Sequence, residues 1–185
     1  MKRLLSAIGL GVVFALLQIG VFAAAQASGQ MLSVVLFHVF AFVNFGSAWA
    51  VVGIAAGGIM LRLRGSIVAG ALSLLAAVWC YYGTAWLSTP GSRWLLDSVA
   101  YWSLAAVAGG PFLGAVGALG RRRDGWSLIA WVGGPLLIVM ETGQQVLVGD
   151  EPGYVLLHIV AWILTAAGVG IGVRRLRATP RIAPV

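Results

Sequence analysis

The sequence predicts an all-α, polytopic membrane helix bundle, and three observations support this fold class. Of the 185 residues, 61% are hydrophobic and only 9% are charged. A water-soluble domain carries about 25% charged residues, so this chain has too little polar surface to cover a globule in water. The apolar residues gather in long stretches of the length that crosses a bilayer as a helix. The 12 Lys and Arg residues stand in short clusters between those stretches.

Six stretches are predicted to be transmembrane helices, and together they form a single domain over residues 1–177. They are Leu4–Ala25, Gly46–Leu61, Ile67–Leu87, Val99–Leu119, Trp126–Val148 and Tyr154–Val173. Residues 178–185 are predicted to be a disordered cytoplasmic tail. If the N-terminus is inside, every Lys and Arg except Arg93 falls on the cytoplasmic side, which is the distribution expected of a cell-membrane protein with both termini inside. The net charge of +7 therefore does not indicate nucleic acid as a partner.

The first stretch has two alternatives. Ala25-Gln26-Ala27 resembles the cleavage site of a signal peptide, but the apolar stretch before it is longer than the roughly 7–15 residues of a signal core. We therefore expect an uncleaved first helix, with cleavage as the open alternative. Ala7, Gly11 and Ala15 form a stripe of small residues on it. Such a stripe packs a neighbouring helix closely or docks another membrane subunit, and the sequence does not separate these two uses.

The segment Met31–Val43 is apolar but too short to cross a membrane. Joined to the next predicted helix it would make a rod of about 48 Å, longer than the ~30 Å hydrocarbon core. We expect a break at Asn44–Ser47, with Asn44 capping the helix that follows. Residues 31–43 are then an outer-face interfacial or re-entrant helix, and one long tilted helix is the alternative.

Two predicted helices repeat the pattern W-S-L-x-A-x-x-G-G-P-x-L, at Trp102–Leu113 and Trp126–Leu137. A Gly-Gly-Pro triplet in the middle of a membrane helix has two common roles. It interrupts the helix to make a binding site, as in transporters, or it lets a neighbouring helix approach closely. Both roles stay open from the sequence.

Four polar residues at the outer end of the last two predicted helices form the strongest candidate site. Glu141, Gln144 and Gln145 share a face of one helix, and His158 lies at a similar depth in the next. A carboxylate inside a membrane is costly and by default indicates function, so we expect a Glu141–His158 pair. A structural polar network is the alternative.

Aromatic and amide residues of other segments are expected at the same outer level. Trp79, Tyr82, Trp86 and Trp102 would stack on a ligand, and Asn44 would add a polar group. The alternative for the aromatic residues is an interfacial belt. The chain has no established catalytic motif and no paired-cysteine metal pattern, so no catalytic residue, cofactor or metal ligand is predicted.

Three blocks of the sequence resemble a family. They are N-x-G-S-A-W-A-x-V from Asn44, Tyr81-Tyr82, and Tyr101–Gly114 followed by basic residues. They are similar to an uncharacterised group of small actinobacterial multi-pass membrane proteins, over roughly residues 40 to 145. That resemblance implies a polytopic membrane protein and no particular activity. The overall plan also resembles the substrate-binding subunits of energy-coupling-factor vitamin transporters.

Three functions follow as hypotheses from these features. The first is a small-molecule-binding or transport subunit with an outward-facing polar and aromatic pocket, covered by residues 31–43. The second is an intramembrane enzyme acting on a lipid or isoprenoid, with Glu141 as general acid or base. The third is an accessory protein without a ligand.

Overall fold

The chain folds into helices, described by a computed structural model over residues 1–122, 124–148 and 152–178. The elements are α1 (Lys2–Ala27), α2 (Gln30–Val43), α3 (Gly46–Ile59), α4 (Leu63–Ser88), α5 (Arg93–Leu119), α6 (Ser127–Val148) and α7 (Pro152–Arg177). No strand occurs in these ranges, so the all-α prediction is confirmed. Most of the predicted tail, residues 179–185, lies outside the described residues.

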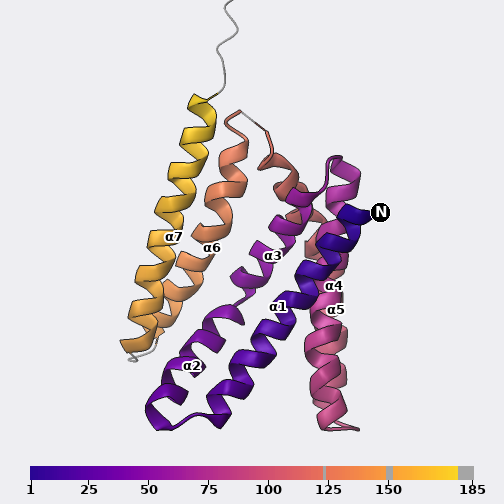
Figure 1. Cartoon of the computed structure of the whole chain (residues 1–185), viewed down its shortest axis with the longest axis vertical. Helices are drawn as coiled ribbons and strands as arrows, with labels where there is room; N and C mark the ends of the chain where they lie inside the picture. The colour runs from indigo at the N-terminus through magenta and orange to yellow at the C-terminus, as the bar shows by residue number, and fades with distance from the viewer. Residues whose placement is uncertain (123, 149–151, 179–185) are drawn as a thin grey trace, which may run out of the picture.

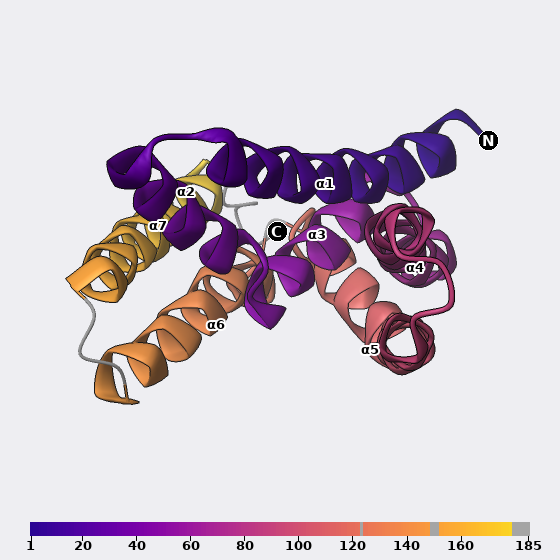
Figure 2. The same cartoon turned by 90° about the horizontal axis from the view of Figure 1, so that it is seen from below.

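The helices run up and down between two ends of the molecule (Figure 1). The N-terminus, the α3–α4 turn and the last turn of α7 lie toward one end, and the α1–α2 and α4–α5 turns lie toward the other. Seen from below, α3 occupies the middle, α4 and α5 pair on one side of it, α6 and α7 pair on the other, α1 runs across α3 and α4, and α2 lies beside α7 (Figure 2).

Basic side chains from separate segments meet at the first of these ends. Arg3 Nη1 donates to the Ile59 carbonyl at 3.2 Å, and Arg121 Nη1 donates to the Gly57 carbonyl at 3.0 Å. Arg175 Nη1 reaches the Gly120 carbonyl at 3.5 Å. The carbonyls at a helix C-terminus lack intrahelical donors, so these arginines also stabilise the helix ends around which they gather.

Four helices of the described chain are long and apolar enough to cross a membrane: α1, α4, α5 and residues 155–177 of α7. The pair α2 and α3 would make a fifth crossing if it is one span, bent by 54° at its break. α6 is outside this set, because Glu141, Gln144 and Gln145 lower the hydropathy of its second half. The six predicted crossings are therefore only partly supported by length and composition.

The predicted second span needs a correction. α3 has 14 residues, which rise about 21 Å and fall short of the ~30 Å core. It is therefore too short to cross alone. The predicted separation of residues 31–43 from the following helix is confirmed, because α2 ends at Val43 and α3 begins at Gly46.

The small residues of α1 pack inside the chain. Ala7 and Ala15 are fully buried, and a Cβ atom at Gly11 would overlap the Ser73 carbonyl of α4. Ala7 lies in a cluster with Ala56 of α3 and Ala69 of α4. The stripe thus lets α1 approach α4 closely, and a partner subunit on α1 would have to use another face.

Glycines also join α3, α4 and α5 at backbone contact. A Cβ atom at Gly57 would overlap Gly114, and one at Gly70 would overlap the Gly110 carbonyl. Lipid tails are as apolar as the side chains, so helices in a membrane associate through this kind of close van der Waals packing. The three helices are therefore closely packed, as are α1 against α4 at Gly11 and α7 against α6 at Gly168.

The two Gly-Gly-Pro triplets serve packing, and neither interrupts its helix. α5 continues through Pro111 and α6 through Pro135. In each triplet the second glycine is buried, at Gly110 against α4 and at Gly134 against Val51 of α3. The first glycine of each, Gly109 or Gly133, faces open space. Of the two roles that the sequence left open for the triplets, the structure supports close packing, and the break between α2 and α3 lies where it was predicted.

The triplet in α5 offers a matched pair of substitutions. A Cβ at Gly110 would lie 2.6 Å from the Ala71 Cα, whereas one at Gly109 meets nothing within 4 Å. Gly110→Ala is expected to destabilise the bundle by about 1–3 kcal/mol, because backbone must move. Gly109→Ala should leave the thermal unfolding midpoint of the detergent-purified protein unchanged or slightly raised. Equal effects of the two substitutions would contradict this packing.

Candidate functional site

The break between α2 and α3 leaves backbone groups that need partners. A helix begins with N–H groups that have no intrahelical acceptor and ends with carbonyls that have no donor. Phe45, the N-cap residue of α3, has no side-chain acceptor to offer. In an apolar surrounding each unsatisfied group costs several kcal/mol, so side chains from other helices have to supply the missing partners.

Glu141 of α6 supplies them to α3. Its Oε1 accepts the Gly46 N–H at 3.0 Å and its Oε2 accepts the Ser47 N–H at 2.8 Å. A carboxylate at a helix N-terminus is favoured by the helix dipole and makes charge-assisted hydrogen bonds. The predicted cap from Asn44 is therefore wrong. Asn44 is exposed and ends α2, and the cap of α3 comes from Glu141, 95 positions after Gly46.

Gln18 of α1 supplies the partner on the other side of the break. Its side chain is fully buried, and its Nε2 donates to the carbonyl of Val43, the last residue of α2, at 2.6 Å. The two helix ends at the break are thus held by polar side chains from two other helices.

Two polar atoms beside the break are buried without a partner. They are Gln18 Oε1 and Ser47 Oγ, and the side chains that carry them are 0% and 6% exposed. Ser47 carries one of the amides that Glu141 caps. An unpaired buried acceptor is unfavourable, so these two atoms leave hydrogen-bonding capacity unused at the break.

His158 does not pair with Glu141, which corrects the expected pair. Its Nδ1 lies 2.9 Å from Thr142 Oγ1, and its Nε2 accepts the Trp162 indole N–H at 3.1 Å. Because the indole only donates, Nε2 is the unprotonated nitrogen and Nδ1 carries the proton. The imidazole therefore ties α7 to α6 through Thr142, a fully buried residue whose hydroxyl also contacts the Ile138 carbonyl at 2.8 Å.

The remaining polar candidates on α6 stand apart from the break. Gln144 is exposed and Gln145 is half-buried. Only Glu141 of the three predicted α6 residues bonds to α3.

The predicted aromatic residues do not converge on one pocket. Trp79 is 62% exposed and Trp86 is 40% exposed, as expected for side chains facing lipid. Tyr82 is half-buried beside Tyr81, with ring centroids 5.0 Å apart. Trp102 lines a cavity of about 130 Å³ between α3, α4 and α5.

The same cavity is lined by Gly46 and Trp49, which the sequence reasoning had left out. A Cβ at Gly46 would lie 3.8 Å from Glu141 Oε1, so the carboxylate is close to the cavity. Trp49 follows Gly46 by three residues and therefore lies on the same side of α3. The predicted break could have identified Trp49, because a residue one turn after the start of a helix lies on the same side as the amides exposed at that start.

Residues 31–43, the expected lid, pack on α1 through aromatic side chains. Phe22 lies 5.0 Å from the Phe40 ring and 6.0 Å from the Phe37 ring, centroid to centroid. No residue of α2 is buried. A covering role for this helix stays a prediction.

No protein-family model, curated protein or solved structure matches the chain. The site therefore has to be interpreted from its own geometry.

Replacing Glu141 tests the cap. Glu141→Gln removes the charge and leaves one of the two amides without an acceptor, so we expect a loss of about 1–3 kcal/mol of stability. Asp97→Asn is the matched control, because Asp97 is exposed on α5. Thermal unfolding in detergent should show a lower midpoint for Glu141→Gln alone. An unchanged midpoint would mean that the capping bonds contribute nothing.

Proposed function

We propose that the protein crosses the cell membrane six times and acts as a small-molecule-binding or transport subunit, with the break between α2 and α3 as its binding site. The observation that carries this proposal is the buried, unpartnered pair of acceptors Gln18 Oε1 and Ser47 Oγ beside the Glu141 carboxylate. Interrupted helices form the binding sites of many transporters, because their ends offer backbone and side-chain groups in the middle of a membrane.

The six crossings in this proposal are α1, the bent pair α2–α3, α4, α5, α6 and α7. The meeting of Arg3, Arg121 and Arg175 around the end of α3 supports an orientation with that end in the cytoplasm. α6 counts as a crossing here because Glu141, the charge that lowers its hydropathy, is hydrogen-bonded to the first amides of α3. Both termini are then cytoplasmic.

Cysteine labelling tests this topology. In a Cys80→Ser background, Thr89→Cys lies in the exposed turn after α4 and Ala178→Cys follows α7. A membrane-impermeant maleimide applied to intact cells should label the first variant and reach the second only after permeabilisation. The reverse result, or equal labelling of both, would contradict the orientation.

The chemistry of the break favours a small cation that carries N–H groups. Gln18 Oε1, Ser47 Oγ and the carboxylate are acceptors, and Trp49 and Trp102 line the neighbouring cavity. Acceptors satisfy N–H donors, and indole faces attract cations. A cavity of about 130 Å³ has room for a solute of a few non-hydrogen atoms. The resemblance to vitamin-binding membrane subunits agrees with a solute-binding role.

The two other hypotheses have less support. As a general base Glu141 would have to release an amide, since both of its oxygens accept backbone N–H groups. As an accessory protein, the chain would have to dock its partner away from the stripe on α1, because Ala7 and Ala15 are fully buried.

Thermal unfolding with added salts tests the ligand class. Methylammonium chloride should raise the unfolding midpoint above that in sodium chloride of the same ionic strength, and methanol, a neutral molecule of similar size, should not. Ser47→Ala and Trp102→Leu should remove the increase, whereas Trp86→Leu, a change at an equally exposed tryptophan that does not line the cavity, should keep it.

An equal increase in sodium chloride would contradict an N–H-bearing ligand. An increase that persists in both Ser47→Ala and Trp102→Leu would remove the break as the site. Because neither substitution removes a group that bonds to Glu141, the capping bonds remain and loss of binding is separable from loss of folding.

A further inference from the structure

A second, larger cavity lies at the basic end of the bundle. It has a volume of about 620 Å³, within the range of about 300–1,000 Å³ that is typical of ligand sites. α3, α6 and α7 form its apolar walls, with Val51, Ile54, Trp131, Pro135, Leu164 and Gly168 among the lining residues. The cavity separates the tightly packed α3–α5 group from the α6–α7 pair, so it is a gap between two parts of one bundle.

Two arginines line this cavity, Arg121 just after α5 and Arg175 in the last turn of α7. Arg121 Nη1 contacts the carbonyls of Gly57 and Gly58 at 3.0 and 3.4 Å and Ser66 Oγ at 3.3 Å. All three partners are neutral. They therefore orient the guanidinium and do not compensate its positive charge.

Arg175 is positioned by Trp131. Its guanidinium carbon lies 4.6 Å from the centre of the indole ring, and the Trp131 Nε1 donates to the Gly120 carbonyl at 3.1 Å. Arg175 Nη1 reaches the same carbonyl at 3.5 Å. Trp131 and Gly120 thus hold this second positive charge at the same end of the cavity as Arg121.

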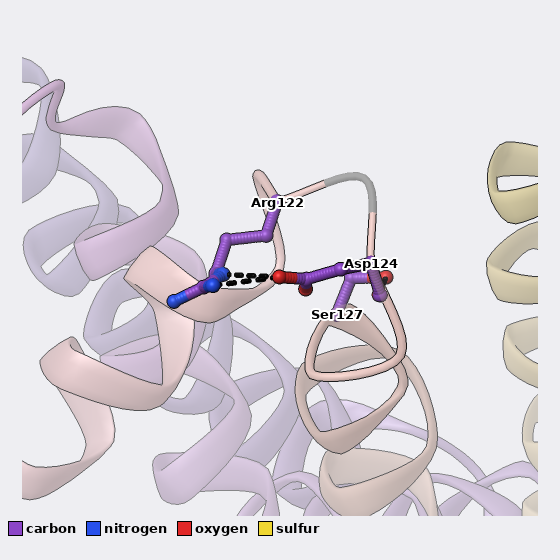
Figure 3. Close-up of polar contacts among 3 residues, drawn as sticks. All are labelled: Arg122, Asp124 and Ser127. Atoms are coloured by element: carbon purple, nitrogen blue, oxygen red, sulfur yellow. Dashed lines mark hydrogen bonds and ion pairs between the residues drawn. The ribbon is translucent and has the colours of Figure 1, made fainter. Parts of the chain in front are cut away.

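The nearest acid in the sequence is already engaged. Asp124 Oδ2 accepts from Arg122 Nε at 2.8 Å and from Arg122 Nη2 at 2.6 Å, and the Asp124 carbonyl accepts from Ser127 Oγ at 2.9 Å (Figure 3). By sequence, the other four acids, Asp97, Glu141, Asp150 and Glu151, lie in α5 near its start, in the second half of α6 and in the α6–α7 connection. The basic end therefore carries a large excess of positive charge.

We propose that this cavity binds a membrane phospholipid with an anionic headgroup, with one acyl chain between α3 and the α6–α7 pair and the phosphate beside Arg121 and Arg175. Guanidinium groups match phosphate in geometry and charge. Basic pockets between membrane helices on the cytoplasmic side bind acidic lipids in this manner. This site lies at the opposite end of α3 from the break and does not depend on the solute proposed there.

Native mass spectrometry of the detergent-purified protein tests the proposal. With phosphatidylglycerol and phosphatidylcholine of identical chains, a one-to-one complex is expected with phosphatidylglycerol in clear preference. Arg175→Gln should weaken that complex about fivefold. Arg177→Gln is the control, because Arg177 is exposed one half-turn further along the same helix and does not line the cavity.

A second pair of variants keeps the test independent of the arginines. Ala167→Phe fills the cavity and should abolish the one-to-one complex, whereas Ala166→Phe, at the neighbouring exposed position outside the lining, should retain it. Equal binding of the two lipids, equal losses within either pair of variants, or displacement by an equal concentration of water-soluble glycerol phosphate would overturn the proposal. None of these results depends on the response to methylammonium.

Discussion

A helix broken inside an apolar bundle is stable only if its exposed backbone groups are hydrogen-bonded, and this constraint organises the molecule. The N-terminal amides of α3 bond to Glu141, and the last carbonyl of α2 bonds to Gln18. These partners come from α6 and α1, so the break can exist only when the first, middle and last parts of the chain are assembled. The glutamate in the apolar sixth helix is thus explained as a capping group for another helix.

The bonds of Glu141 join two groups of helices that face each other across a cavity. α3, α4 and α5 meet through glycines at backbone distance, whereas a cavity of about 620 Å³ separates this group from much of α6 and α7. The contact of Glu141 with α3 and that of Arg175 with Gly120 connect the two regions near opposite ends of the gap. Close packing provides stability without a hydrophobic driving force, and looser packing leaves room for ligands.

Much of the fold was predictable because it depends on local sequence. The length of the apolar stretches predicted the helices: α1, α4, α5 and α7 contain the stretches predicted for them, and α6 begins one residue after its predicted start. The break after Val43 also followed from local signals, since Asn44 and Gly46 disfavour a continuous helix.

The site was less predictable because its contacts are distant in sequence. Helical spacing places Glu141 on a face of α6 but does not say which helix start lies opposite, and so Asn44 was assigned a cap that Glu141 makes. Depth alone suggested that His158 would meet Glu141, but the relative rotation of α6 and α7 presents Thr142 instead. Trp79 and Trp86 share a helix with buried residues, and only the packing of α4 shows that they face outward.

The most direct test of the central claim is NMR of the Gly46 and Ser47 amides in the ¹⁵N-labelled protein. Hydrogen bonds to a carboxylate should place both amide protons downfield of other helix-start amides. Glu141→Gln should move both signals upfield, while Asp97→Asn leaves them in place. Signals that do not respond to Glu141→Gln would contradict the claim that this carboxylate holds the broken helix.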